Sequence, residues 1–95
     1  MPNYVVLTTL TDYGRKTVRA NPRRILEVNA ELKGMGVTLK DQYALFGQYD
    51  FVNIMEAPDD AVLTKALLQL ASRGTVSTMT LPATPTEEWV RTLGG

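Results

Sequence analysis

The stretch Phe46-Gly47-Gln48-Tyr49-Asp50-Phe51-Val52 decides the fold, because strand-forming residues run into it and out of it around a glycine-led turn. The flanking segments 37–46 and 51–56 are rich in β-branched and aromatic residues, which favour strands. The pair Gly47-Gln48 suits a two-residue type II′ turn, whose first central position requires a positive φ. The stretch therefore predicts a β-hairpin in the middle of the chain.

The turn also determines which side chains of the hairpin share a face. A two-residue turn pairs Ala44 with Phe51 and Gln42 with Asn53, and ladder partners point to the same side of the sheet. One face is mostly aliphatic, and we expect helices to cover it; it carries Val37, Leu39, Asp41, Tyr43, Leu45, Asp50, Val52, Ile54 and Glu56. The other face, which we expect to remain open, carries Phe46, Tyr49, Phe51 and Met55.

Two further strands flank the predicted hairpin in sequence. The segment 4–10 carries apolar residues on both faces, which is typical of a central strand buried on both sides. The segment 75–81 is rich in Thr and Val and has alternating side chains, so it predicts the last strand. Between the first strand and the first helix, the segment 11–20 lacks a clear period, so we expect an irregular connection with at most one helical turn.

Helix signals fill the remaining segments. Asn21-Pro22 begins a helix that ends near Gly34, and Pro58-Asp59-Asp60 begins a second that ends at Gly74. A short tail helix over about 84–92 follows from Thr84, Pro85 and Glu87, which fit a capping box.

The order strand, helix, strand, strand, helix, strand predicts a ferredoxin-like α+β fold, with a four-stranded antiparallel sheet and two helices on one face. Residues 1–95 are expected to form one domain of this kind. An open face that carries large apolar side chains usually marks an interface. We therefore expect a homodimer, or a higher even oligomer, with an interface that includes Phe46, Phe51, Met55 and Trp89.

Composition narrows the classes of function. Ten basic and ten acidic residues balance, which argues against a general nucleic-acid or membrane-surface binder. The chain has no cysteine and no histidine, so the commonest nucleophile pairs and metal ligands are missing. We assign no catalytic residue, metal or cofactor. The sequence shows no signal peptide and no membrane-spanning run, so we expect a cytoplasmic protein.

The hairpin also carries a family resemblance. Gly47-x-Tyr49-Asp50, followed by Glu56-Ala57-Pro58-Asp59-Asp60, resembles the GYD domain family, over a span from Tyr4 to about Trp89. The resemblance implies a ferredoxin-like fold of the dimeric α/β-barrel kind. It carries no established activity with it.

The expected topology locates a candidate binding site. The start of the third strand should lie beside the end of the first, next to the basic connection. This would gather Tyr49, Asp50, Asp12, Tyr13, Arg15, Lys16 and Arg19. Such a group could receive a carboxylate or phosphate. The alternatives are that Asp50 pairs with an arginine or with backbone amides, that Tyr49 is a packed aromatic, and that the basic run is a solvated surface.

Three functional hypotheses remain open at this point. The leading one is a homodimeric small-molecule-binding or sensing module with an anion site near the end of the sheet. The second is a cofactor-free enzyme of the dimeric-barrel type, such as a small monooxygenase or isomerase that uses Tyr49 or Asp50. The third is an accessory subunit that binds a partner protein through the tail helix.

Overall fold

Four strands and four helices make up the fold in the computed structural model, which describes residues 1–95. In chain order they are β1 (Asn3–Leu10), α1 (Asp12–Ala20), α2 (Arg24–Gly34), β2 (Thr38–Ala44), β3 (Phe51–Glu56), α3 (Asp60–Ala71), β4 (Val76–Ala83) and α4 (Thr86–Thr92). The strands form one sheet in the order β2-β3-β1-β4, and every neighbouring pair is antiparallel. The predicted α+β class and four-stranded antiparallel sheet are confirmed.

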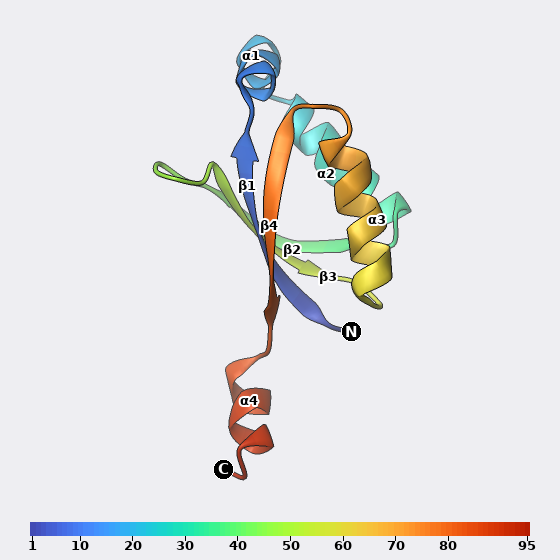
Figure 1. The fold of residues 1–95 in the computed structure, drawn as a ribbon, viewed down its shortest axis with the longest axis vertical. Helices are drawn as coiled ribbons and strands as arrows, with labels where there is room; N and C mark the ends of the chain where they lie inside the picture. Colours follow the sequence, from blue (N-terminus) through green and yellow to red (C-terminus); the bar gives the residue numbers. More distant parts are fainter.

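Helices α2 and α3 cover one face of the sheet, and the hairpin tip projects on the other side of the molecule (Figure 1). The core lies between the sheet and these helices. Its nine buried apolar residues are Tyr4, Val6, Leu32, Val37, Met55, Ala57, Leu63, Ala66 and Leu70. No helix combines the length and the hydropathy that a bilayer crossing requires.

The predicted pairing of the hairpin is confirmed, whereas its turn is wider than expected. Gln42 pairs with Asn53 and Ala44 with Phe51. The last bond across the hairpin runs from the Leu45 amide to the carbonyl oxygen of Asp50, at 2.8 Å. Residues 46–49 therefore form a four-residue tip, and a loop of this length preserves the pairing parity of a two-residue turn.

The assignment of the two faces of the hairpin was wrong. Met55 is buried under the helices, and Asn53 lies beside the fully buried Val6 of β1. The aliphatic residues Val52 and Ile54 point to the open side instead. The reason is that both faces carry apolar side chains, so alternation alone could not choose between them. The hairpin residues that lie on the same side of the sheet as Val6 form the inner face.

A β-bulge in β2 adds to this difference. The register shifts between Leu39 and Asp41, so Leu39 pairs with Met55 while Asp41 pairs with Ile54. The extra residue is Lys40, and it moves Leu39 from the open side to the core side. Leu39 packs against the core, as predicted. It does so because of the bulge, which the predicted register did not include.

The first connection is more regular than expected. Helix α1 replaces the predicted irregular segment, and the side chain of Thr11 caps it by accepting a hydrogen bond from the Gly14 amide at 3.0 Å. Asn21 ends this helix: its amide makes the last helical hydrogen bond, to the carbonyl oxygen of Thr17 at 3.0 Å, and its own φ of −146° and ψ of 86° leave the helical region. The predicted role of Asn21 as the cap of the next helix is therefore wrong, and α2 begins three residues later, at Arg24.

The tail helix forms where it was expected, as α4, and lies beyond the end of the sheet opposite α1 (Figure 1). Its predicted capping box is not made, because Pro85 precedes the helix and no side chain caps it. Trp89, Val90 and Leu93 are exposed on or next to this helix.

Candidate functional site

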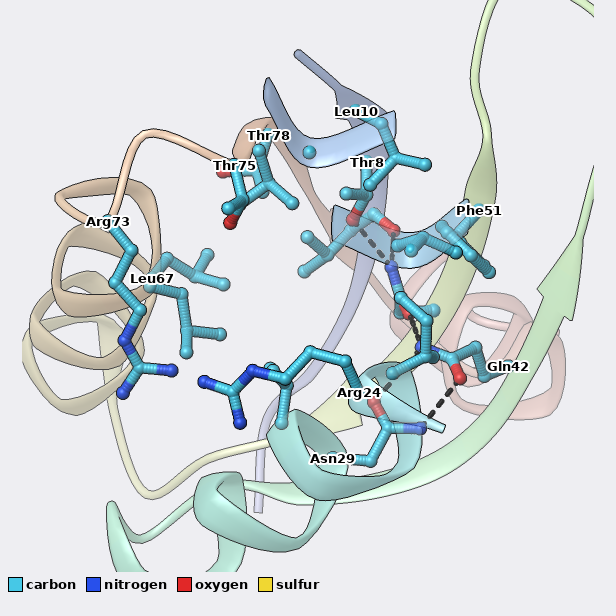
Figure 2. Close-up of a pocket in the computed structure, with 18 of the residues that line it drawn as sticks. Thr8, Leu10, Arg24, Asn29, Gln42, Phe51, Leu67, Arg73, Thr75 and Thr78 are labelled. Carbon is cyan, nitrogen blue, oxygen red and sulfur yellow. Dashed lines mark hydrogen bonds between the residues drawn. The ribbon is translucent and has the colours of Figure 1, made fainter. Parts of the chain in front are cut away.

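A cavity of about 300 Å³ lies between the inner face of the sheet and helices α1, α2 and α3 (Figure 2). A volume of this size is at the lower end of the range for small-molecule pockets. Most of the wall is apolar: Val6, Leu10, Val18, Ile25, Val28, Leu32, Phe51, Met55, Leu67, Leu70 and Val76.

Amide side chains form a hydrogen-bonded chain along one wall of the cavity. Asn53 is 2% exposed and donates to the Val6 carbonyl oxygen at 2.7 Å and to Thr8 Oγ1 at 3.0 Å. Its own Oδ1 accepts from Gln42 Nε2 at 2.8 Å, and Gln42 exchanges two hydrogen bonds with Asn29 of α2, at 2.7 and 3.2 Å. This chain ties α2, β2, β3 and β1 together and orients every amide in it (Figure 2).

Two arginines line the cavity on the side opposite Thr75 and Thr78 (Figure 2). Both pair with one carboxylate: Glu31 lies 2.6 Å from Arg73 Nη1 and 3.5 Å from Arg24 Nη1. The hydrogen bond from Arg73, followed by the charges of Arg73 and Arg24, lowers the pKa of Glu31 from its ordinary value. Glu31 is therefore ionised at neutral pH and holds the two guanidinium groups close together.

The predicted site residues at the start of β3 have separate partners. Asp50 Oδ2 accepts from the Leu10 amide at 2.7 Å, and the Asp50 amide donates to the Thr8 carbonyl oxygen at 2.8 Å. Tyr49 reaches towards β4, where its hydroxyl lies 3.7 Å from Met79 Sδ. The carboxylate of Asp50 thus joins the ends of β1 and β3, which matches the alternative in which it satisfies backbone amides.

The predicted site residues on α1 lie mostly on its outer surface. Asp12 and Arg15 form an exposed ion pair at 3.0 Å, and Lys16 and Arg19 are exposed. Of the seven predicted site residues, Tyr13 lines the cavity, although its side chain is 63% exposed.

The predicted interface residues do not share one surface either. Phe46 is fully exposed at the hairpin tip, and Trp89 is exposed on α4. Phe51 and Met55 instead line the cavity on the inner face, which corrects their expected position on the open face.

Sequence reasoning missed the polar groups of the cavity, among them Arg24, Arg73 and Asn29. One signal was present, since the predicted hairpin register already placed Gln42 opposite Asn53 on one face. A polar pair facing an otherwise apolar layer indicates a buried hydrogen-bond network when a third amide, here Asn29, lies on the helix that covers it.

The fold and the interlayer cavity define a small α+β protein with helices on one face of a four-stranded antiparallel sheet. The chain belongs to the GYD domain family, because the GYD domain model matches residues 4–93. This confirms the resemblance carried by Gly47, Tyr49 and Asp50, which lie in the hairpin tip and at its end.

Among curated proteins, the chain is 52% identical over 94 residues to a Thermus thermophilus protein named "Glutamine synthetase and cystathionine beta-lyase binding protein"; the match covers 98% of this chain and 99% of that protein. Two solved structures share the fold. One is TTHA0845, also from Thermus thermophilus, with 21% identity, a TM-score of 0.57, and coverage of 90% of this chain and 95% of that one. The other is a protein of the FFRP kind, with 20% identity, a TM-score of 0.59, and coverage of 88% of this chain and 100% of that one.

Proposed function

We propose that this protein is a homodimeric accessory module that binds a metabolic enzyme of the glutamine synthetase or cystathionine β-lyase kind and senses a small molecule. The observation that carries the proposal is the 52% identity, over nearly the full length of both chains, to a relative named for binding these two enzymes.

Two protruding apolar elements support a role in protein binding. Phe46 stands fully exposed at the hairpin tip, which projects to one side, and Trp89 and Leu93 are exposed on or next to α4, at the end of the molecule opposite α1 (Figure 1). Exposed aromatic side chains supply much of the affinity in protein interfaces. A hairpin tip and a tail helix that stand away from the sheet can reach a partner that the sheet itself does not touch.

The open face of the sheet supports the homodimer. Leu81, Val5 and Ile54 lie in one row across β4, β1 and β3, and Met79, Leu7 and Val52 lie in the next. Six neighbouring apolar side chains form a patch of the kind that usually marks an interface. Two copies packed sheet against sheet would bury it and form a ferredoxin-like dimeric α/β barrel.

The enzyme-binding part is tested with purified glutamine synthetase and cystathionine β-lyase from the source organism, titrated with this protein in biolayer interferometry. We expect at least one enzyme to bind, and Phe46→Ser or Trp89→Ser to weaken binding roughly tenfold or more, as loss of an aromatic hot spot does. The matched controls Gln48→Ser and Glu88→Gln change exposed neighbours on the same two elements and should leave the affinity unchanged.

If neither purified enzyme binds the wild-type protein, the enzyme-binding part is wrong. If Phe46→Ser and Trp89→Ser both bind like their controls, the partner uses another surface, and the assignment to the hairpin tip and tail helix fails.

A further inference from the structure

The shape and lining of the cavity restrict what it can hold. A volume of about 300 Å³ suits a compact molecule, and the apolar wall favours an aliphatic or aromatic body. The amides of the inner wall already have partners, because Asn53, Gln42 and Asn29 bond to one another, to Thr8 and to the Val6 carbonyl oxygen. The charged residues of the lining are Arg24 and Arg73, so an anionic group on the ligand needs a partner there.

The arginine pair provides that partner. Within the protein, both guanidinium groups form their ion pairs through Nη1, so the donors on Nε and Nη2 of Arg24 and Arg73 remain for another acceptor. Their side chains are 34% and 32% exposed, so both are partly shielded from water yet reachable. Planar, forked donors of this kind match the two oxygens of a carboxylate.

The charges of the cavity favour a singly charged anion. Arg24 and Arg73 line the cavity, whereas their ion-pair partners Glu27 and Glu31 do not, so the charged groups of the lining are cationic. The two glutamates balance the two arginines overall. One carboxylate therefore adds less uncompensated charge to a mostly apolar space than a phosphate or phosphonate dianion does.

We propose that the cavity binds a small monocarboxylate with an apolar body, held by Arg24 and Arg73 at its carboxylate and by the apolar wall around Val28, Leu67 and Val76. The inference rests on the proposed function in that it names the class of ligand that the module senses. It moves the expected anion site from the exposed basic face of α1 to the inner side of α2 and the end of α3.

The test compares matched probes on the isolated wild-type protein by isothermal titration calorimetry. Isovalerate and phenylacetate are the carboxylates, isovaleramide and phenylacetamide their neutral isosteres, and benzylphosphonate the dianion. We expect at least one carboxylate to bind tenfold or more tightly than both its amide and the phosphonate. Equal binding of acid and amide, or no binding of either acid, would overturn the proposal without any variant.

Variants then locate the site. Arg24→Gln and Arg73→Gln should each remove the preference for acid over amide, and Leu67→Phe should weaken acid and amide alike by filling the cavity. Arg15→Gln, on the outer surface of α1, is the matched control and should behave like wild type. Circular dichroism confirms folding, and Arg73→Lys, which keeps the charge that Glu31 needs but loses the fork, replaces Arg73→Gln if that variant unfolds. A preference that survives the changes at Arg24 and Arg73 contradicts the proposed site.

Enzyme capture is measured separately, without any probe present. If the wild-type protein captures an enzyme but binds neither acid probe, the cavity inference alone is overturned. If it binds an acid probe but captures neither enzyme, the enzyme-binding proposal alone is overturned.

Discussion

Asn53 shows how one buried polar residue connects the layers of this protein. Its side chain makes three hydrogen bonds, to a main-chain carbonyl and a hydroxyl of β1 and to an amide of β2. A buried side-chain amide is tolerated when its polar atoms are hydrogen-bonded, whereas a buried polar atom without a hydrogen-bond partner costs free energy. Asn53 therefore requires the hairpin, β1 and α2 to meet in one arrangement.

Substitution Asn53→Ala should lower the free energy of unfolding by about 3 kcal/mol, because three hydrogen bonds disappear and Gln42 loses an acceptor in a buried place. Urea unfolding followed by circular dichroism measures the change. Gln48→Ala at the exposed hairpin tip is the control and should stay within about 0.5 kcal/mol of wild type. A loss below about 1 kcal/mol at Asn53 would show that the network contributes little.

Tyr4 gives the protein a pH dependence at the alkaline end. Its hydroxyl donates to Asp60 Oδ1 at 2.5 Å, and this bond, together with burial and the neighbouring charges of Asp60 and Asp59, raises the pKa of Tyr4 from 10.0 to about 12. The raised pKa means that the folded state favours the neutral phenol. The stabilisation is therefore complete below pH 10 and is lost as the pH rises from 10 to about 12.

Urea unfolding between pH 9 and about 12 should show this fall in the wild-type protein and a flatter profile in Tyr4→Phe, which has no phenol to ionise. Tyr43→Phe, on the open face, serves as the control and should keep the wild-type slope. Parallel profiles for wild type and Tyr4→Phe would contradict the assignment.

At the scale of elements, the approach of α1 to β4 depends on Gly14. A Cβ atom at this position would lie 2.0 Å from the carbonyl oxygen of Thr75, and backbone cannot move aside as a flexible side chain can. The same contact is reinforced by Thr11, which donates its amide to the Thr75 carbonyl oxygen at 3.0 Å and its hydroxyl to the Gly74 carbonyl oxygen at 2.6 Å. The close approach of α1 closes one end of the cavity.

Substitution Gly14→Ala should therefore destabilise the protein by about 2 kcal/mol, by forcing α1 away from β4. Gly34→Ala is the matched control, since Gly34 is also helical and has no heavy atom within 4 Å of a built Cβ; it should be neutral or slightly stabilising. Thermal unfolding of both variants compares them. If the two shift the midpoint equally, the contact with Thr75 is not the cause.

In a single subunit the open face of the sheet exposes apolar side chains to solvent, and the proposed dimer would bury them. Substitution Ile54→Lys places an ammonium group in the middle of this face, opposite Asp41 of β2, so an isolated subunit can accommodate it. Between two packed sheets the same charge would be desolvated at a high cost. We expect the mass in solution to fall from about twice 10.5 kDa to about 10.5 kDa.

Light scattering coupled to size-exclusion chromatography measures that mass. The control Leu68→Lys makes a similar change on the exposed side of α3 and should leave the dimer intact. A wild-type protein that runs as a monomer would rule out the proposed sheet-to-sheet assembly.

Local chemistry in the sequence determined the elements and much of their pairing. β-Branched and aromatic segments form the strands, capping residues such as Asp59 begin helices, and the parity of the hairpin loop sets Gln42 against Asn53. The family followed from the same local motif. The helix α1 is amphipathic, but it was missed because its inner side carries few large apolar residues: Gly14 is its one buried residue.

Only the tertiary structure decided which face of the hairpin became the core and where the cavity lies. Both faces are apolar, and the choice depended on contacts with β1 and the helices, which strand periodicity does not encode. The arginine pair has the same origin: Arg24 and Arg73 are 49 positions apart in the chain, and only the packing of α2 against the end of α3 brings them to one carboxylate.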